Sequence, residues 1–105
     1  MNAPIGVSIV GASIRSTMIC GYLRKNPQQG RITGLYDLIP ERGRHLLDMY
    51  EFRDVPVYDS LEAAVRDPAA STVFVGTPDG AHVEPVLAAL ESGKHVYCEK
   101  PMAIT

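Results

Sequence analysis

Short β-branched apolar runs alternate with segments of helical period along the whole chain, and this alternation constrains the fold more than any other feature. The first run, residues 5–10 (IGVSIV), ends at Gly11 and suits a strand buried on both faces. In the next segment the apolar residues recur at helical spacing, and the pattern ends at Asn26 and Pro27. These apolar residues are Ile14, Met18, Ile19, Tyr22 and Leu23. This stretch predicts a strand, a glycine turn and a helix.

The rest of the chain repeats the pattern. We predict further strands over residues 31–36, 55–58, 71–75 and 94–98. Three further helices are predicted between these strands. The first begins near Pro40, the second follows a capping box of Asp59 with Glu62, and the third begins at about His82 and has Gly93 as its C-terminal cap. Their predicted apolar faces are, in turn, Leu46, Leu47 and Tyr50; Leu61, Ala64 and Val65; and Val83, Val86, Leu87 and Leu90.

Strands that alternate with helices predict an α/β fold with a parallel sheet covered on both faces. Pro56 cannot donate a ladder hydrogen bond, which places residues 55–58 at an edge of the sheet. A doubly wound, Rossmann-like sheet of order 3-2-1-4-5 follows, in which ligands bind beyond the carboxyl ends of the strands, where the order reverses. The strand ends are Gly11, Asp37, residues 76–78 and residues 99–101.

The composition argues against a nucleic-acid-binding, membrane or metal-binding protein. With 105 residues, 46% apolar and 21% charged, and a net charge of −2, the chain is predicted to be a single soluble domain without a basic field for nucleic acid. Its apolar stretches are too short to span a membrane, and its first residues lack the pattern of a signal peptide, so we expect a cytoplasmic protein. Cys20 and Cys98 match no metal-ligand spacing, so we expect two reduced thiols and no metal.

The first turn, GASIRS, is a degraded form of the dinucleotide fingerprint G-x-G-x-x-G, with Ser13 and Ser16 in the second and third glycine places. A Cβ at Ser13 should push a pyrophosphate outward, although the hydroxyl and the helix N-terminus are still able to bind it. The candidate cofactor-binding residues here are Gly11, Ser13, Ile14 and Arg15. The alternative is a tight turn with a serine N-cap and no ligand.

Asp37 ends the second predicted strand, where a carboxylate accepts both hydroxyls of an adenine ribose and repels a 2′-phosphate. This position favours NAD over NADP. The alternative is an aspartate that caps the next turn. Three arginines keep NADP possible, although we interpret the last two as surface residues: Arg15, Arg42 and Arg44.

The stretch GTPDGAH follows the fourth predicted strand. Thr77 and Pro78 are expected to form a rigid extended loop against the cofactor, and His82 to begin a helix that faces the cleft. We take His82 as a binding candidate only, because a lone histidine at such a place is more often a capping or packing residue than a catalyst.

Residues 75–103, VGTPDGAHVEPVLAALESGKHVYCEKPMA, resemble the Gfo/Idh/MocA family of glucose-fructose oxidoreductase, inositol 2-dehydrogenase and their relatives. The resemblance implies an NAD(P)-dependent oxidoreductase with an N-terminal Rossmann domain and a C-terminal α/β domain for a sugar, cyclitol or related polyol. It also implies that Glu99 lies at the cofactor and that Lys100 orients the substrate and assists proton transfer. The alternative for Lys100 is a solvated residue at a strand end.

Two departures from the family pattern qualify these expectations: Ser13 and Ser16 replace fingerprint glycines, and the second domain is absent from this sequence. We therefore expect residues 1–105 to be the NAD(P)-binding domain of a longer, homo-oligomeric enzyme, able to bind the cofactor but not to turn over by itself. The alternative is a non-catalytic dinucleotide-sensing or interaction module. A flavodoxin-like receiver is less well supported, because such folds gather acidic residues at the end of the first strand.

Overall fold

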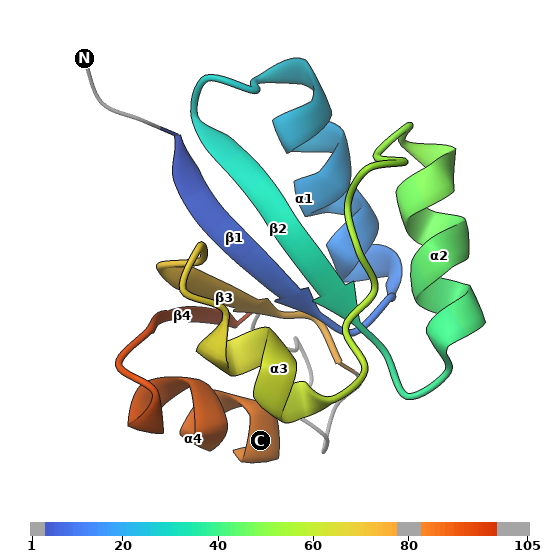
Figure 1. Cartoon of the computed structure of the whole chain (residues 1–105). Coiled ribbons are helices and arrows are strands. Elements are labelled where there is room, and N and C mark those ends of the chain that lie inside the picture. Colours follow the sequence, from blue (N-terminus) through green and yellow to red (C-terminus); the bar gives the residue numbers. More distant parts are fainter. Residues whose placement is uncertain (1–3, 78–82, 99–105) are drawn as a thin grey trace, which may run out of the picture.

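A four-stranded parallel sheet of order β2-β1-β3-β4 organises the protein (Figure 1). The computed structural model describes residues 4–77 and 83–98. Its elements are β1 (Ile5–Val10), α1 (Ile14–Lys25), β2 (Gly30–Tyr36), α2 (Pro40–Met49), α3 (Leu61–Arg66), β3 (Thr72–Val75), α4 (Val83–Glu91) and β4 (His95–Cys98). The predicted doubly wound α/β architecture is confirmed, and β1 has the predicted bounds.

Residues 55–58 do not form the predicted strand. They make a single parallel bridge, between Leu35 and Val57, on the outer side of β2. Pro56 has no N–H to extend the ladder, and the carbonyl of Val55 accepts a hydrogen bond from Arg44 Nη1 at 2.9 Å instead. The predicted order 3-2-1-4-5 is therefore not confirmed, although the four strands that form have the predicted neighbours.

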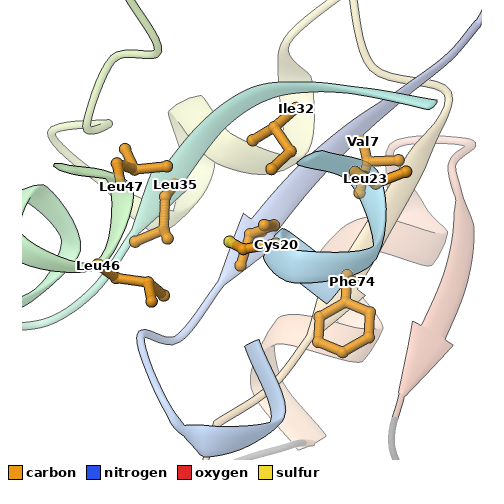
Figure 2. Close-up of a cluster of buried hydrophobic side chains, with 9 residues drawn as sticks. Val7, Cys20, Leu23, Ile32, Leu35, Leu46, Leu47 and Phe74 are labelled. Atoms are coloured by element: carbon orange, nitrogen blue, oxygen red, sulfur yellow. The ribbon is translucent and has the colours of Figure 1, made fainter. Parts of the chain in front are cut away.

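Two apolar clusters lie on opposite faces of the sheet. Helices α1 and α2 cover one face, and α3 and α4 cover the other (Figure 1). In β1, Ile9 belongs to the first cluster and Val10 to the second, as the two-residue period of a strand requires. Figure 2 shows the first cluster, in which Leu35 and Leu47 are fully buried.

The side of α1 that faces the sheet differs from the side that carries its exposed apolar residues. Ser16, Cys20 and Leu23 are buried, whereas Ile14, Met18 and Tyr22 are 81%, 64% and 48% exposed. On the buried side, Ser16 Oγ donates a hydrogen bond to the Gly11 carbonyl in the turn that precedes the helix. Periodicity predicted the helix correctly but did not reveal which of its two apolar sides contacts the sheet.

Helix α3 begins one residue later than its predicted capping box implies. Ser60, rather than Asp59, is the N-cap, and its hydroxyl accepts a hydrogen bond from the Ala63 N–H at 3.1 Å. The prediction of a capping box formed by Asp59 and Glu62 is therefore wrong. Ala64 and Val65 are buried as predicted.

Helix α4 ends at Glu91, and Gly93 follows it as the predicted C-terminal glycine. The positive φ of 79° at Gly93 suits glycine, and its N–H donates to the Leu90 carbonyl at 3.0 Å. The predicted apolar face is partly wrong, because Leu87 and Leu90 are 53% and 56% exposed while Ala89 is fully buried. The residues against the sheet are smaller than the pattern of large apolar side chains indicated.

The thiol of Cys20 is free and fully buried, and burial raises its pKa to about 12. The side chain of Cys98 lies outside the described residues. Within residues 4–77 and 83–98, no group of three or more His, Cys, Asp or Glu side chains is placed to hold a metal ion. No helix in the same ranges is long and apolar enough to cross a membrane.

We predict that Leu47→Ala lowers the free energy of unfolding by about 2–5 kcal/mol, because it leaves a cavity where α2 packs on β2. Leu38→Ala is the matched control, since Leu38 is 86% exposed. Urea unfolding followed by circular dichroism measures both. Equal losses in the two variants would contradict this description of the core.

Candidate functional site

The turn after β1 requires glycine at Gly11. Its φ is 101°, and an added Cβ would lie 2.9 Å from both the Gly76 carbonyl carbon and the Thr77 nitrogen. The Gly11 N–H donates to the Tyr36 carbonyl at 2.7 Å. The turn is thereby held against the carboxyl ends of β2 and β3, which is the predicted position of the ligand site.

The two serines that replace fingerprint glycines, Ser13 and Ser16, hold this turn in place through side-chain hydrogen bonds. Ser13 Oγ donates to the Gly76 carbonyl, and Ser16 Oγ donates to the Gly11 carbonyl. Ser16 is fully buried, so its hydrogen bond satisfies a hydroxyl that has no access to solvent. Ser13 is the N-cap of α1 but makes no side-chain capping hydrogen bond.

Asp37 joins β2 to the turn. Its Oδ1 accepts a hydrogen bond from the Ala12 N–H at 2.8 Å, and its Oδ2 accepts one from the Ile39 N–H at 3.0 Å. The side chain is only 12% exposed, and Arg42 Nε lies 4.0 Å from Oδ2. The capping role that we considered for Asp37 is therefore present in the structure, and the same carboxylate also positions the first residue after Gly11.

The N-terminus of α1 opens at this site and suits an anion. The helix begins at Ile14, and no acidic residue lies in its first turn. The partial positive charge of a helix N-terminus and its backbone N–H groups favour a pyrophosphate, so the residues present fit a dinucleotide. Ile14 is 81% exposed, and Arg15 follows it on the first turn.

Of the remaining predicted residues, the structure places only Thr77 at the turn. Thr77 contacts the turn, because its Cγ2 would lie 3.0 Å from a Cβ at Gly11, whereas Pro78, His82, Glu99 and Lys100 lie outside the described residues. Arg44 is not at the site: it donates to the carbonyls of Val55 and Phe52 and pairs with Asp48.

Sequence reasoning did not predict Ala12 as part of the site, and it placed Gly76 at a strand end without listing it among the cofactor-binding residues. The glycine that directly follows a buried strand was the available signal for Gly76. An added Cβ there would lie 2.5 Å from Ser16 Oγ.

A parallel α/β sheet with a glycine turn, a helix N-terminus and a strand-ending aspartate at its switch point defines a dinucleotide-binding Rossmann domain. Residues 5–105 match the model of GFO_IDH_MocA, an oxidoreductase family with an NAD-binding Rossmann fold. The chain belongs to this family, which confirms the resemblance found in its sequence.

Three proteins illustrate the relationship. The chain is 46% identical over 55 residues to scyllo-inositol 2-dehydrogenase (NADP(+)) IolW of Bacillus subtilis, covering 52% of this chain and 15% of that protein. It is 31% identical over 98 residues to inositol 2-dehydrogenase/D-chiro-inositol 3-dehydrogenase of Lactiplantibacillus plantarum, covering 93% and 28%. The structure of Lactobacillus casei myo-inositol dehydrogenase with NAD(H) and myo-inositol matches with a TM-score of 0.85, at 24% identity, covering 95% and 29%. The chain thus spans less than a third of each relative.

We predict that Gly76→Ala lowers the free energy of unfolding by about 1–3 kcal/mol, because its Cβ crowds Ser16 Oγ. Ser16→Ala removes that oxygen, so Gly76→Ala should cost less in a Ser16→Ala background. A double-mutant cycle in urea measures the coupling, expected at about 0.5–3 kcal/mol. Strictly additive losses would mean that the turn is not packed against β3 as described.

Proposed function

We propose that residues 1–105 are the NAD(P)-binding domain of an oxidoreductase that transfers hydride between a nicotinamide cofactor and a sugar, cyclitol or related polyol. The observation that carries the proposal is the hydrogen bond between Asp37 Oδ1 and the Ala12 N–H, 2.8 Å long. The Asp37 carboxylate therefore lies beside the Gly11 turn and the N-terminus of α1, so a single dinucleotide is able to contact the carboxylate, the turn and the helix.

In this proposal the turn and the start of α1 hold the pyrophosphate, through Gly11, Ser13, Ile14 and Arg15. Because Ser13 Oγ already donates to a carbonyl, backbone N–H groups supply most of the binding. Asp37 accepts the hydroxyls of the adenine ribose. Each of its oxygens receives one backbone N–H and keeps a further lone pair for a ribose hydroxyl.

We propose NAD as the preferred cofactor, because a carboxylate at this position repels a 2′-phosphate. Arg42 lies beside Asp37 and is 58% exposed, so it offsets part of that repulsion and keeps NADP possible. The names of the relatives support both cofactors, since IolW is named for NADP(+) and the L. casei structure contains NAD(H).

The nicotinamide end of the site is proposed from the sequence. Thr77, Pro78, His82 and Glu99 would bind the cofactor there, and Lys100 would orient a substrate hydroxyl and take up or return its proton. A bound nicotinamide supplies hydride acceptance and donation. The substrate class rests on the inositol dehydrogenases among the relatives, and substrate binding is assigned to polypeptide outside residues 1–105.

The cytoplasmic location and the homo-oligomeric state of the complete protein stay predictions within this proposal. The alternative of a non-catalytic dinucleotide-sensing or interaction module is less well supported, because the relatives described above are named as dehydrogenases. Both hypotheses share the same cofactor site.

We predict that the chain binds NAD more tightly than NADP and that Asp37→Ala weakens NAD binding at least about tenfold, because the ribose hydroxyls lose a charged acceptor. Isothermal titration calorimetry measures the affinities. Asp48→Ala is the matched control, because Asp48 is an exposed aspartate on α2 that pairs with Arg44.

Asp37 also supports the turn, so thermal unfolding of each variant must accompany the titration. Loss of NAD binding in a variant that still unfolds cooperatively supports the proposed site. Absence of detectable binding of either dinucleotide to the unsubstituted chain would overturn the proposal. Unchanged NAD affinity in Asp37→Ala would overturn the role of Asp37.

A further inference from the structure

The segment between α2 and α3 lies across the outer edge of β2, and we call residues 52–58 the edge strap (Figure 1). On its inner side, β2 pairs with β1. On its outer side, two backbone hydrogen bonds attach the strap to Leu35: the Leu35 N–H donates to the Pro56 carbonyl at 3.1 Å, and the Tyr58 N–H donates to the Leu35 carbonyl at 2.8 Å. Two such bonds do not offset the conformational entropy of ordering the whole segment, so side chains must supply the rest of its attachment.

The edge strap contacts both apolar layers of the protein. Phe52, Val55 and Val57 pack against the first apolar cluster, whereas Tyr58 packs against the second. The neighbouring side chains of Val57 and Tyr58 therefore lie on opposite faces of the sheet, as in an extended segment. The strap thus wraps around β2 and covers an edge whose unpaired backbone groups would otherwise be open to pairing with another chain.

The guanidinium of Arg44, on α2, is the first side chain that holds the strap. Its Nη1 donates to the Val55 carbonyl at 2.9 Å, and its Nη2 donates to the Phe52 carbonyl at 3.0 Å. An arginine stays protonated in proteins, and a backbone carbonyl does not titrate. These two hydrogen bonds are therefore insensitive to pH.

The side chain of Tyr58 is the second. Its ring lies against the backbone of β2 at Gly34, where an added Cβ would lie 2.4 Å from Tyr58 Cζ. Its hydroxyl donates to Asp67 Oδ2 at 2.5 Å and lies 2.9 Å from Thr33 Oγ1. Because Asp67 directly follows α3, this hydrogen bond joins the strap to the connection between α3 and β3.

The carboxylate of Asp67 is the titratable acceptor in this contact. Its Oδ1 accepts a hydrogen bond from the Ala69 N–H at 2.9 Å. The charged groups that act on it are Lys94, whose Nζ also donates to the Asp67 carbonyl at 2.7 Å, and Arg31 of β2. The hydrogen bond from Tyr58 is the largest of the causes that lower the pKa of Asp67 below its ordinary value of 3.8.

The hydrogen bond between Tyr58 and Asp67 is complete at neutral pH and is lost at both extremes. Because the pKa of Asp67 is lowered in the folded protein, the stability that this carboxylate contributes is present above pH 3.8 and is lost as the pH falls through the lowered pKa. Burial, followed by the hydrogen bond to Asp67, raises the pKa of Tyr58 above 10.0. The contribution of the hydroxyl is therefore lost only as the pH rises through that raised pKa.

We propose that the edge strap is a pH-sensitive cover of β2, which opens at its Tyr58 end when Asp67 takes up a proton, while the rest of the sheet stays folded. Arg44 continues to hold the other end of the strap. This device is separate from the dinucleotide site, because Asp67 precedes β3 in the chain, whereas the Gly11 turn and Asp37 lie at the carboxyl ends of β1 and β2.

Amide hydrogen exchange in the full chain, measured by NMR without cofactor, tests the proposal. We expect Tyr58→Phe to speed exchange of the amides at positions 35 and 58 at least about tenfold at about pH 6, because the ring stays but its hydrogen bond to a charged acceptor is lost. The Ile9 amide in β1 should change by less than about twofold. Tyr22→Phe is the matched control, since it removes an exposed hydroxyl that donates to Gln29 Oε1.

Acidification supplies the second arm. Corrected for intrinsic exchange rates, the difference between the unsubstituted chain and Tyr58→Phe should shrink severalfold between about pH 6 and about pH 3, because Asp67 becomes protonated. Asp67→Asn should expose the same two amides at about pH 6, which keeps the test open if Tyr58→Phe folds poorly. A difference that does not depend on pH, unchanged exchange at positions 35 and 58, or an equal increase at Ile9 would overturn the proposal.

Discussion

The hydrogen bond from the Ala12 N–H to Asp37 Oδ1 is the interaction on which the site depends. It fixes the turn after β1 relative to the carboxyl end of β2. The Gly11 N–H reinforces it through the Tyr36 carbonyl, and Ser13 connects the same turn to Gly76 at the end of β3. These hydrogen bonds join the carboxyl ends of β1, β2 and β3, and the N-terminus of α1 lies beside them.

The altered fingerprint shows how a glycine position can be replaced without losing the turn. In dinucleotide-binding folds the third glycine permits close packing of helix and strand. Here Ser16 occupies that place, fully buried, and Gly76 supplies the missing space on the strand side, where a Cβ would lie 2.5 Å from Ser16 Oγ. The close approach of helix and strand is possible here because Gly76, on the strand side, has no Cβ.

The sequence predicted those parts of the fold that depend on local patterns. The apolar run of β1, the helix stop at Gly93 and the strand-ending Asp37 follow from turn chemistry and strand period, and the structure contains them. The rotation of α1 was not predictable, because Met18 and Cys20 lie on two apolar sides and only tertiary packing chooses between them. The second contact of Asp37, with Ala12, was equally hidden, because it joins residues 25 positions apart.

The central claim is that a dinucleotide binds at the carboxyl ends of β1, β2 and β3, beside the N-terminus of α1. A ¹H–¹⁵N NMR titration of the chain with NAD tests it most directly. The account predicts that the largest amide shifts occur at Gly11 to Arg15, Asp37 and Gly76. Ile5, Gly30 and Thr72, at the opposite ends of β1, β2 and β3, should shift little. Shifts concentrated at Ile5, Gly30 and Thr72, with the Gly11 turn unchanged, would contradict it.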